Sequence, residues 1–269
     1  MAAPLIYAVG DIHGRYDLLT RLLAKLARDS ARRAGAGRPM LIFCGDYIDR
    51  GPQSAEVVEA VLWLRENTRF ELRALKGNHE QGLLDFLDRP LAAAGWLGVG
   101  GMETLESYGV TAPDLDDEVG LARARRDLLS RMPASHLQFF EALEPMAVVG
   151  DYAFVHAGIR PGLPLAEQQE RDLLWIRGPF LEAEGPFEKI IVHGHSWLGP
   201  EPQRLPHRLG IDTGAYQTGV LTAVRLDAEG ASFIQARITE ERAEPPEPMK
   251  PAAALPPLGP RLNDTRFLG

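Results

Sequence analysis

Five short polar motifs, each directly after an apolar run, contain residue types that bind metal ions. An apolar run that ends at glycine or a polar residue is typical of a buried strand followed by a tight turn. In open α/β sheets, ligands bind beyond the carboxyl ends of the strands. We therefore expect one shared site built from the motifs Gly10-Asp11-Ile12-His13-Gly14, Gly45-Asp46-Tyr47-Ile48-Asp49-Arg50-Gly51, Gly77-Asn78-His79-Glu80, His156-Ala157-Gly158 and Gly194-His195-Ser196.

The donors in these motifs favour a pair of divalent ions. Carboxylate, amide and imidazole donors without a thiolate suit Mn²⁺, with Fe or Zn²⁺ as alternatives. The set is too large for one ion, and Asp46, central in the series, is the natural bridge between two. Two such ions clamp a phosphoryl group and activate a shared water that attacks phosphorus in line. The candidate metal ligands are Asp11, His13, Asp46, Asn78, His156 and His195.

The remaining polar residues fit the other needs of phosphoryl transfer. Guanidinium groups stabilise charge on the phosphoryl oxygens, so Arg50 and Arg177 are candidates for binding phosphate, together with Asn78. His79 is the candidate general acid for the leaving alkoxide, with Asp49 orienting its ring. The alternatives are that Arg50 only ends a strand and that Arg177 lies on a solvated loop.

Taken together, the five motifs resemble those of the metallophosphoesterases. Within that superfamily they are most similar to the phosphoprotein phosphatase branch, which includes bacterial and phage serine/threonine phosphatases and the symmetrical diadenosine tetraphosphatases. The resemblance covers about Leu5 to Leu226. It implies one metal held by Asp11, His13 and Asp46, a second held by Asp46, Asn78, His156 and His195, the acid pair His79 and Asp49, and the phosphate arginines Arg50 and Arg177.

The resemblance leaves the substrate open between two phosphoester classes. The Asp49-Arg50 pair is similar to the protein phosphatases, whereas the tetraphosphatases tend to have Asn-Arg there. We therefore predict a serine/threonine-type protein phosphatase acting on a phosphorylated protein, peptide or small phosphoester. A symmetrical dinucleoside polyphosphate (Ap4A) hydrolase is the alternative. A non-catalytic scaffold is disfavoured because such a protein is expected to lack ligands.

Alternating apolar segments predict an α/β fold with a helical insertion. The first third reads as βαβαβα, in which a helix ends near Ala27, a basic surface connection spans Arg28 to Arg38, and Ser54 caps the next helix. The stretch 89–145 reads as an inserted group of helices, including a glycine cluster at Gly95 to Gly101 whose spacing only loosely matches a dinucleotide loop.

A second run of strands follows the insertion. We assign the segments 147–149, 153–155, 190–192, 218–226 and 232–238 to a second sheet facing the first, which gives a four-layer sandwich of two mixed sheets flanked by helices. This catalytic domain is expected to span residues 1–242. The proline-rich stretch 243–269 is expected to be an extended tail that could recruit a partner.

Composition excludes several other classes. A net charge of -8 disfavours a nucleic acid polymer as the partner, and no apolar run approaches the roughly 20 residues of a membrane span. We expect a cytoplasmic protein. The single cysteine, Cys44, is expected to fill the core. Outside the ligand set, His136 and His207 are expected at the surface, and His193 either supports a ligand or reaches the phosphate.

Overall fold

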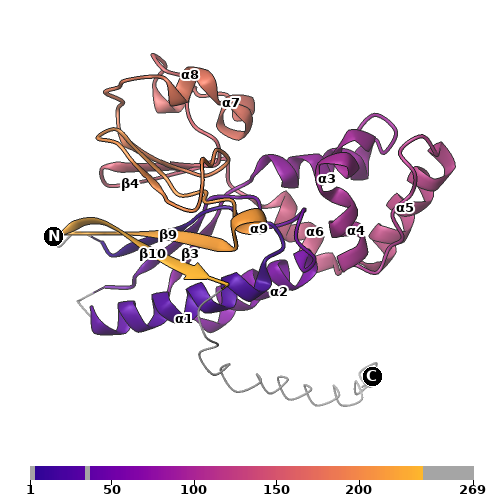
Figure 1. Ribbon diagram of the computed structural model, residues 1–269, viewed down its shortest axis with the longest axis horizontal. Coiled ribbons are helices and arrows are strands. Elements are labelled where there is room, and N and C mark those ends of the chain that lie inside the picture. The colour runs from indigo at the N-terminus through magenta and orange to yellow at the C-terminus, as the bar shows by residue number, and fades with distance from the viewer. Residues whose placement is uncertain (1–3, 34–36, 239–269) are drawn as a thin grey trace, which may run out of the picture. The chain divides into compact units, whose positions relative to one another are not determined.

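The computed structural model describes residues 4–33 and 37–238 (Figure 1). The expected proline-rich tail at 243–269 lies outside these ranges, as do the last residues of the expected catalytic domain. Within the described ranges, no helix is both long and apolar enough to cross a membrane.

The first sheet is built around the three strands of the βαβαβα unit. Strands β1 (Ile6–Val9), β2 (Met40–Phe43) and β3 (Glu71–Ala74) are parallel, with Ile6 opposite Met40 and Met40 opposite Glu71. On the other side of β1 lies the antiparallel hairpin of β9 (Val220–Asp227) and β10 (Gly230–Arg237), which gives the order β10-β9-β1-β2-β3.

The assignment of β9 and β10 to the second sheet was wrong. The tight turn between β9 and β10 makes them a hairpin, but such a turn does not specify which sheet edge the pair joins. Seven of the eight residues of β9 are buried, so this strand needs a neighbour on each side and a layer on each face. The edge of β1 provides that position.

The second sheet consists of strands from the region after the insertion. Its order is β4 (Met146–Val149), β5 (Tyr152–Val155), β6 (Ile190–His193), β8 (Arg208–Gly210) and β7 (Gln203–Arg204). β5, β6 and β8 are parallel, whereas β4 and β7 pair antiparallel at the edges. The predicted mixed character is therefore confirmed, although the short strands β7 and β8 were not predicted.

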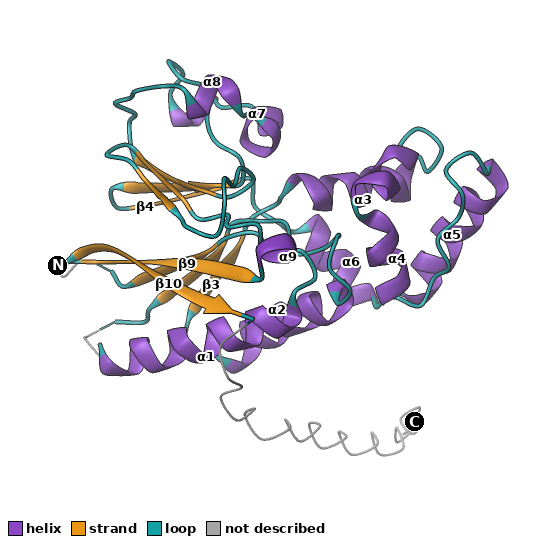
Figure 2. Cartoon of the chain, viewed as in Figure 1, coloured by secondary structure: helices purple, strands orange, loops and turns teal. Residues whose placement is uncertain are grey.

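Three apolar cores hold the layers together and confirm the predicted four-layer sandwich (Figure 2). Helices α1 (Tyr16–Arg32) and α2 (Ser54–Asn67) pack on the outer face of the first sheet. Side chains such as Ile42 and Phe154, and with them the buried Cys44, fill the space between the sheets. Helices α7 (Glu170–Trp175) and α8 (Gly178–Leu181) cover the second sheet.

The insertion is helical, as predicted, and continues the first core beyond the end of the sheet. It follows α3 (Asn78–Asp88) and contains η1 (Ala94–Val99), α4 (Gly101–Ser107), α5 (Glu118–Arg131) and α6 (Ala134–Glu141). Two further short elements are η2 (Leu165–Glu167) and α9 (Ala215–Thr218). Helix α4 was not predicted, because it begins in the glycine cluster.

Three local predictions were wrong for reasons of packing. Helix α1 continues through Arg28 to Arg32 because Ser30 on its inner face is buried. The Ser54 side chain does not cap α2, because its hydroxyl accepts a hydrogen bond from the Asp49 N–H at 3.0 Å. His136 is buried between the insertion and α2, bonded to Tyr108 and Glu59.

Candidate active site

The five polar motifs meet at one rim, where strands of both sheets end. β1, β2 and β3 run parallel in the first sheet, and β5 and β6 run parallel in the second. Each of the five strands is followed by one motif. The sandwich therefore brings together side chains that lie as far apart in the sequence as Asp11 and His195, whose backbone N–H donates to the Asp11 carboxylate at 3.0 Å.

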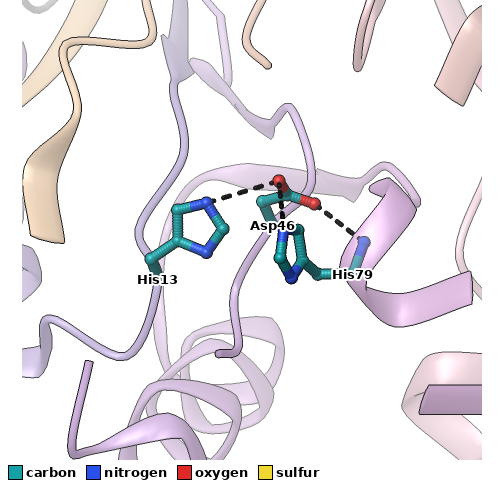
Figure 3. Close-up of side chains that lie close together, drawn as sticks. All are labelled: His13, Asp46 and His79. Atoms are coloured by element: carbon teal, nitrogen blue, oxygen red, sulfur yellow. Dashed lines mark hydrogen bonds and ion pairs between the residues drawn. The ribbon is translucent and has the colours of Figure 1, made fainter. Parts of the chain in front are cut away.

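Asp46 lies at the centre of this cluster and faces two groups of buried donors. One group is His13, Asp46 and His79, and the other is Asp46, His156 and His195; within each, the donor atoms lie within 4.8 Å of one another. The Asp46 carboxylate is 3.4 Å from His13 Nε2 and 3.9 Å from His79 Nε2 (Figure 3). It is also 3.4 Å from His156 Nε2. Asp46 is thus the residue common to both groups.

The histidine tautomers fit a cation at this place. The backbone carbonyls of Ile48 and Cys44 accept hydrogen bonds from Nδ1 of His13 and His156, at 2.8 and 2.9 Å. These bonds place the ring hydrogen on Nδ1 and leave a lone pair on Nε2. His156 Nε2 then faces a second acceptor, Asn78 Oδ1, at 2.8 Å. Two acceptor atoms this close together repel each other, and a divalent cation bound to both would remove the repulsion.

Burial keeps these imidazoles neutral. It lowers the pKa of His13 to about 3 and that of His195 to about 2, and it also lowers the pKa of His156. Neutral imidazole is the form that binds metal ions. The imidazoles of His13, His156 and His195 therefore need no deprotonation near neutral pH before they can bind a cation.

Asp11 lies beside the two groups, together with a second buried carboxylate, that of Asp212. Burial raises the pKa of Asp11, and the negative charges of Asp212 and Asp46 raise it further. Burial likewise raises the pKa of Asp212 to about 6. For all three carboxylates to be ionised together in this buried space, a compensating positive charge is needed.

Several site residues are held in a left-handed backbone conformation. Among the described residues, those other than glycine with positive φ are His13, Asp46, Asp49, Arg50 and His195. This conformation is unfavourable for side chains with a Cβ, and such strain concentrates at functional sites. Arg50 and His195 each lie at the centre of a three-residue turn, closed by Gly51 N to Asp49 O and by Ser196 N to Gly194 O, both at 2.7 Å.

Glu80 stabilises the central motif, although the sequence analysis gave it no role. Its carboxylate accepts hydrogen bonds from the backbone N–H groups of Asp46, Tyr47 and Gly77 at 2.9, 2.8 and 2.8 Å. Burial raises the pKa of Glu80 to about 8, while the N–H groups of Tyr47 and Asp46 act in the opposite direction. Its place directly after His79 was the available signal, since a helix N-terminus favours an acid in its first turn.

His79 and Asp49 are in direct contact, and the insertion holds Asp49 in place. His79 Nδ1 donates to Asp49 Oδ2 at 2.6 Å. Trp96 Nε1 donates to the same oxygen at 2.7 Å, and Thr104 Oγ1 donates to Oδ1 at 2.6 Å. Burial alone would lower the pKa of His79, but Asp46 and Asp49 outweigh it and raise that pKa. Trp96 and Thr104 were missed because nothing in a helical insertion indicates contact with a distant turn.

We expect Trp96→Phe to reduce kcat about tenfold, because it removes one hydrogen bond to a buried carboxylate while keeping an aromatic ring against Phe86. Steady-state kinetics on an aryl phosphate would measure the change. Trp63→Phe is the matched control, because Trp63 is 39% exposed on α2. Equal kcat values for Trp96→Phe and the unaltered protein would contradict this role.

Two arginines border the donor groups. Arg50 Nη1 donates to His13 Nε2 at 2.8 Å, and its guanidinium lies 4.7 Å from the centre of the Tyr216 ring. Arg177, an exposed residue, donates through Nε to His195 Nε2 at 3.1 Å. The two guanidinium groups therefore lie at the two ends of the cluster.

The glycine cluster of the insertion lies against Arg50 and has no nucleotide-loop geometry. Gly100 has φ of 121° and accepts a hydrogen bond from the Arg50 N–H at 3.1 Å. A Cβ at Gly100 would lie 2.8 Å from the Arg50 nitrogen, so only glycine allows this approach. The cluster is thus a contact surface for the turn that carries Arg50.

His193 and His207 lie apart from the two donor groups. His193 is buried, and its ring bonds the Gly194 carbonyl and Arg208. It supports the turn before His195 and does not point at the donors. His207, partly buried against Phe187, is not the surface residue that was expected.

Comparisons with known proteins agree with this geometry. The family model of the calcineurin-like phosphoesterases matches residues 4–213. The chain is 27% identical over 223 residues to the symmetrical bis(5'-nucleosyl)-tetraphosphatase of Xanthomonas oryzae pv. oryzae, a match that covers 82% of this chain and 58% of that protein. It is 28% identical to the asymmetrical bis(5'-nucleosyl)-tetraphosphatase PrpE of Anoxybacillus flavithermus, covering 81% of this chain and 88% of the relative.

A solved structure shares the fold. The serine/threonine phosphatase of Saccharomyces cerevisiae with similarity to human phosphatase PP5 superposes with a TM-score of 0.54 at 14% identity, covering 90% of this chain and 82% of that one. At this identity the likeness concerns the fold alone. The match to the Xanthomonas relative covers less than two thirds of that protein, so its name does not by itself define the substrate of this chain.

Proposed function

The chain belongs to the calcineurin-like phosphoesterase family, and from this premise we propose that it is a metal-dependent phosphoester hydrolase, of the serine/threonine protein phosphatase type. The proposal rests on the convergence of buried neutral imidazoles and carboxylates around Asp46. A cation would allow the carboxylates of this cluster to be ionised together, and the two arginines that border it suit a phosphoryl group.

The metal ligands in this proposal are those that the sequence predicted. Asp11, His13 and Asp46 would hold one divalent ion, and Asp46, Asn78, His156 and His195 the other, with Mn²⁺ as the first choice. When bound, the pair would neutralise charge on the phosphoryl group and make a water molecule more acidic. The backbone carbonyls of Ile48 and Cys44 keep two of the imidazoles in the tautomer that binds.

The arginines bind and orient the substrate. Arg50 and Arg177 now donate to Nε2 of His13 and His195. If those nitrogens held cations, their lone pairs would not be available as acceptors, and both guanidinium groups would be free to bind phosphoryl oxygens. Their planar donors suit a bidentate contact, and the Asn78 amide supplies a further donor.

His79 supplies the proton for the departing alkoxide. Its Nδ1 is held by Asp49, so Nε2 is the atom that carries the proton toward the leaving oxygen. Asp49 is buried and has three hydrogen-bond partners on its carboxylate, which fixes the direction of the ring. An imidazole oriented by a buried carboxylate is suited to general acid catalysis near neutral pH.

The Asp49–His79 hydrogen bond is the observation that favours a phosphomonoester of serine or threonine. Serine and threonine alkoxides are poor leaving groups and need a proton as the bond to phosphorus breaks. A carboxylate that raises the pKa of His79 keeps that proton available. A nucleotide phosphate is a better leaving group and has less need of a charged partner for the acid.

A symmetrical dinucleoside tetraphosphatase is the second candidate. The Xanthomonas oryzae relative has that name and matches most of this chain. Two aromatic rings also lie beside the donor groups: Tyr216 is 5.4 Å from the His13 ring, and the half-exposed Trp175 is 6.5 Å from the His195 ring. Rings in these positions could stack on a nucleobase.

We expect hydrolysis of p-nitrophenyl phosphate that disappears with a chelator and returns with Mn²⁺, because the carboxylates and neutral imidazoles need the cation to bind phosphate. Absence of activity with every divalent ion would contradict the proposed function. A side-by-side assay on a phosphoserine peptide and diadenosine tetraphosphate then separates the two candidates. Higher kcat/KM on the peptide supports the phosphatase, and higher kcat/KM on the dinucleotide supports the alternative.

A further inference from the structure

Arg208 is a buried cation without a carboxylate partner, and the proposed chemistry leaves it without a role. It is 6% exposed on β8, and among the described residues it forms no ion pair. Its Nη1 donates to Gln203 Oε1 at 2.9 Å and to His193 Nε2 at 3.2 Å. The Cζ atom of its guanidinium group lies 6.0 Å from the centre of the Phe180 ring. Burying a guanidinium among neutral groups is costly, so its placement calls for a reason.

The contact with Arg208 fixes the tautomer of His193. A guanidinium has only donors, so His193 Nε2 must be the acceptor in this pair. The ring hydrogen is therefore on Nδ1, which donates to the Gly194 carbonyl at 3.0 Å. In the other tautomer, the Nδ1 lone pair would face the carbonyl oxygen, and the contact would become repulsive.

The Gly194 carbonyl is the acceptor that closes the turn presenting His195. It also receives the Ser196 N–H at 2.7 Å, and His195 at the centre has φ of 63°. Three-residue turns with this sign of φ are rare and strained. Gly194 packs on the Asp11 carboxylate, where a Cβ would overlap it, so the turn has no room to relax toward that side.

We propose that Arg208 is a positioning residue for the metal centre, which acts through His193 and the Gly194 carbonyl to hold the strained turn that presents His195. This inference rests on the proposed metal site but not on the identity of the substrate. The loss of Arg208 is expected to weaken binding of the ion that His195 holds more than binding of the other ion, which the same turn reaches only through the hydrogen bond from His195 N–H to Asp11. Partners of metal ligands typically change metal affinity by about 10-fold to 100-fold.

The experiment measures Mn²⁺ binding to the full chain by isothermal titration calorimetry, without substrate. Arg208→Met should lower the affinity for one of the two Mn²⁺ ions about 10-fold to 100-fold. Arg208→Lys keeps a donor group and should lower that affinity less. Arg225→Met is the matched control, since Arg225 is similarly buried, at 9% exposure. Arg225 pairs with Asp29 and Asp227, and it lies opposite Tyr7 on β1, away from the end of that strand that leads into the Asp11 motif. Arg225→Met should leave both affinities unchanged.

Two substitutions of His193 test the same step without removing the arginine. His193→Asn places an amide N–H where Nδ1 lies and keeps a donor to Gly194, whereas His193→Phe keeps the ring but has no donor. Binding should be near normal in His193→Asn and weak in His193→Phe. Adding Arg208→Met to His193→Asn should cause little further loss, because the amide needs no partner to fix its tautomer.

Unchanged Mn²⁺ affinities in folded Arg208→Met would overturn the inference, and so would equal losses in Arg208→Met and Arg225→Met. If Arg208→Met fails to fold, the two His193 variants provide the test. Equal Mn²⁺ affinities in His193→Asn and His193→Phe would then overturn the inference. A protein that binds Mn²⁺ as expected but hydrolyses no phosphopeptide would count against the proposed function and leave this inference standing.

Discussion

Replacing Asp46 with asparagine is expected to abolish turnover, with a loss of about 10³-fold or more in kcat, equivalent to about 4 kcal/mol. Asp46 is the residue common to both donor groups, so this substitution removes a negative charge that either cation would need. An amide also offers one oxygen where the carboxylate offers two. Mn²⁺ titration and steady-state hydrolysis of an aryl phosphate would measure the two effects together.

The control for Asp46→Asn has to separate a loss of metal binding and catalysis from a general destabilisation of the fold. Asp227→Asn makes the same change in an aspartate whose side chain is only 12% exposed and which pairs with Arg225, outside the donor groups. We expect it to keep both metal binding and kcat. Metal-dependent turnover that is undiminished in Asp46→Asn would favour the non-catalytic scaffold that the sequence analysis disfavoured.

Replacing His79 with asparagine is expected to lower kcat by about 10²- to 10⁴-fold for an alkyl phosphate. The loss should be much smaller for p-nitrophenyl phosphate, because its leaving group departs without a proton. His79 also lies in one of the donor groups, 3.9 Å from Asp46, so loss of metal must be excluded by titration. Equal losses on the two substrates, with metal binding intact, would remove His79 from the role of acid.

Asp49→Asn tests the role of His79 as general acid through the pH dependence of kcat. The Asp49 carboxylate favours the charged form of His79 and so raises its pKa, although burial works in the opposite direction. Removing that charge lowers the pKa, and the imidazole then loses its proton at a lower pH. The alkaline limb of the kcat profile should therefore move to lower pH in Asp49→Asn.

The fold could be predicted as far as local patterning and chain topology reach. Alternating strands and helices at Leu5 to Leu87 define a parallel sheet, because a helix between two strands returns the chain to the edge where the first strand began, and the next strand then runs in the same direction. The placement of β9 and β10 could not be predicted. Their turn specifies which strands pair with each other, but the choice of sheet depends on which exposed edge and which apolar faces remain to be covered.

The two donor groups contain only residues from the predicted motifs, because all their members except Asp46 are histidines, of which the chain has 7. His79 and Asp49 were paired on chemical grounds, and the structure brings them into contact. Trp96 and Thr104, which hold Asp49, were not found. An indole or hydroxyl in a helical segment has many possible partners, and only packing selects one of them.

The residue types that follow each buried strand can be read from the sequence alone, and they indicate the class of chemistry that one rim of the sandwich can support. The tertiary structure decided the rest. It placed Asp46 between two donor groups, used backbone carbonyls to set the tautomers of His13 and His156, and brought Arg208 behind the His195 turn. Strand patterns and turn preferences depend on residues that are close in the sequence. These contacts join groups that are far apart in the sequence and that approach each other only after both sheets have packed.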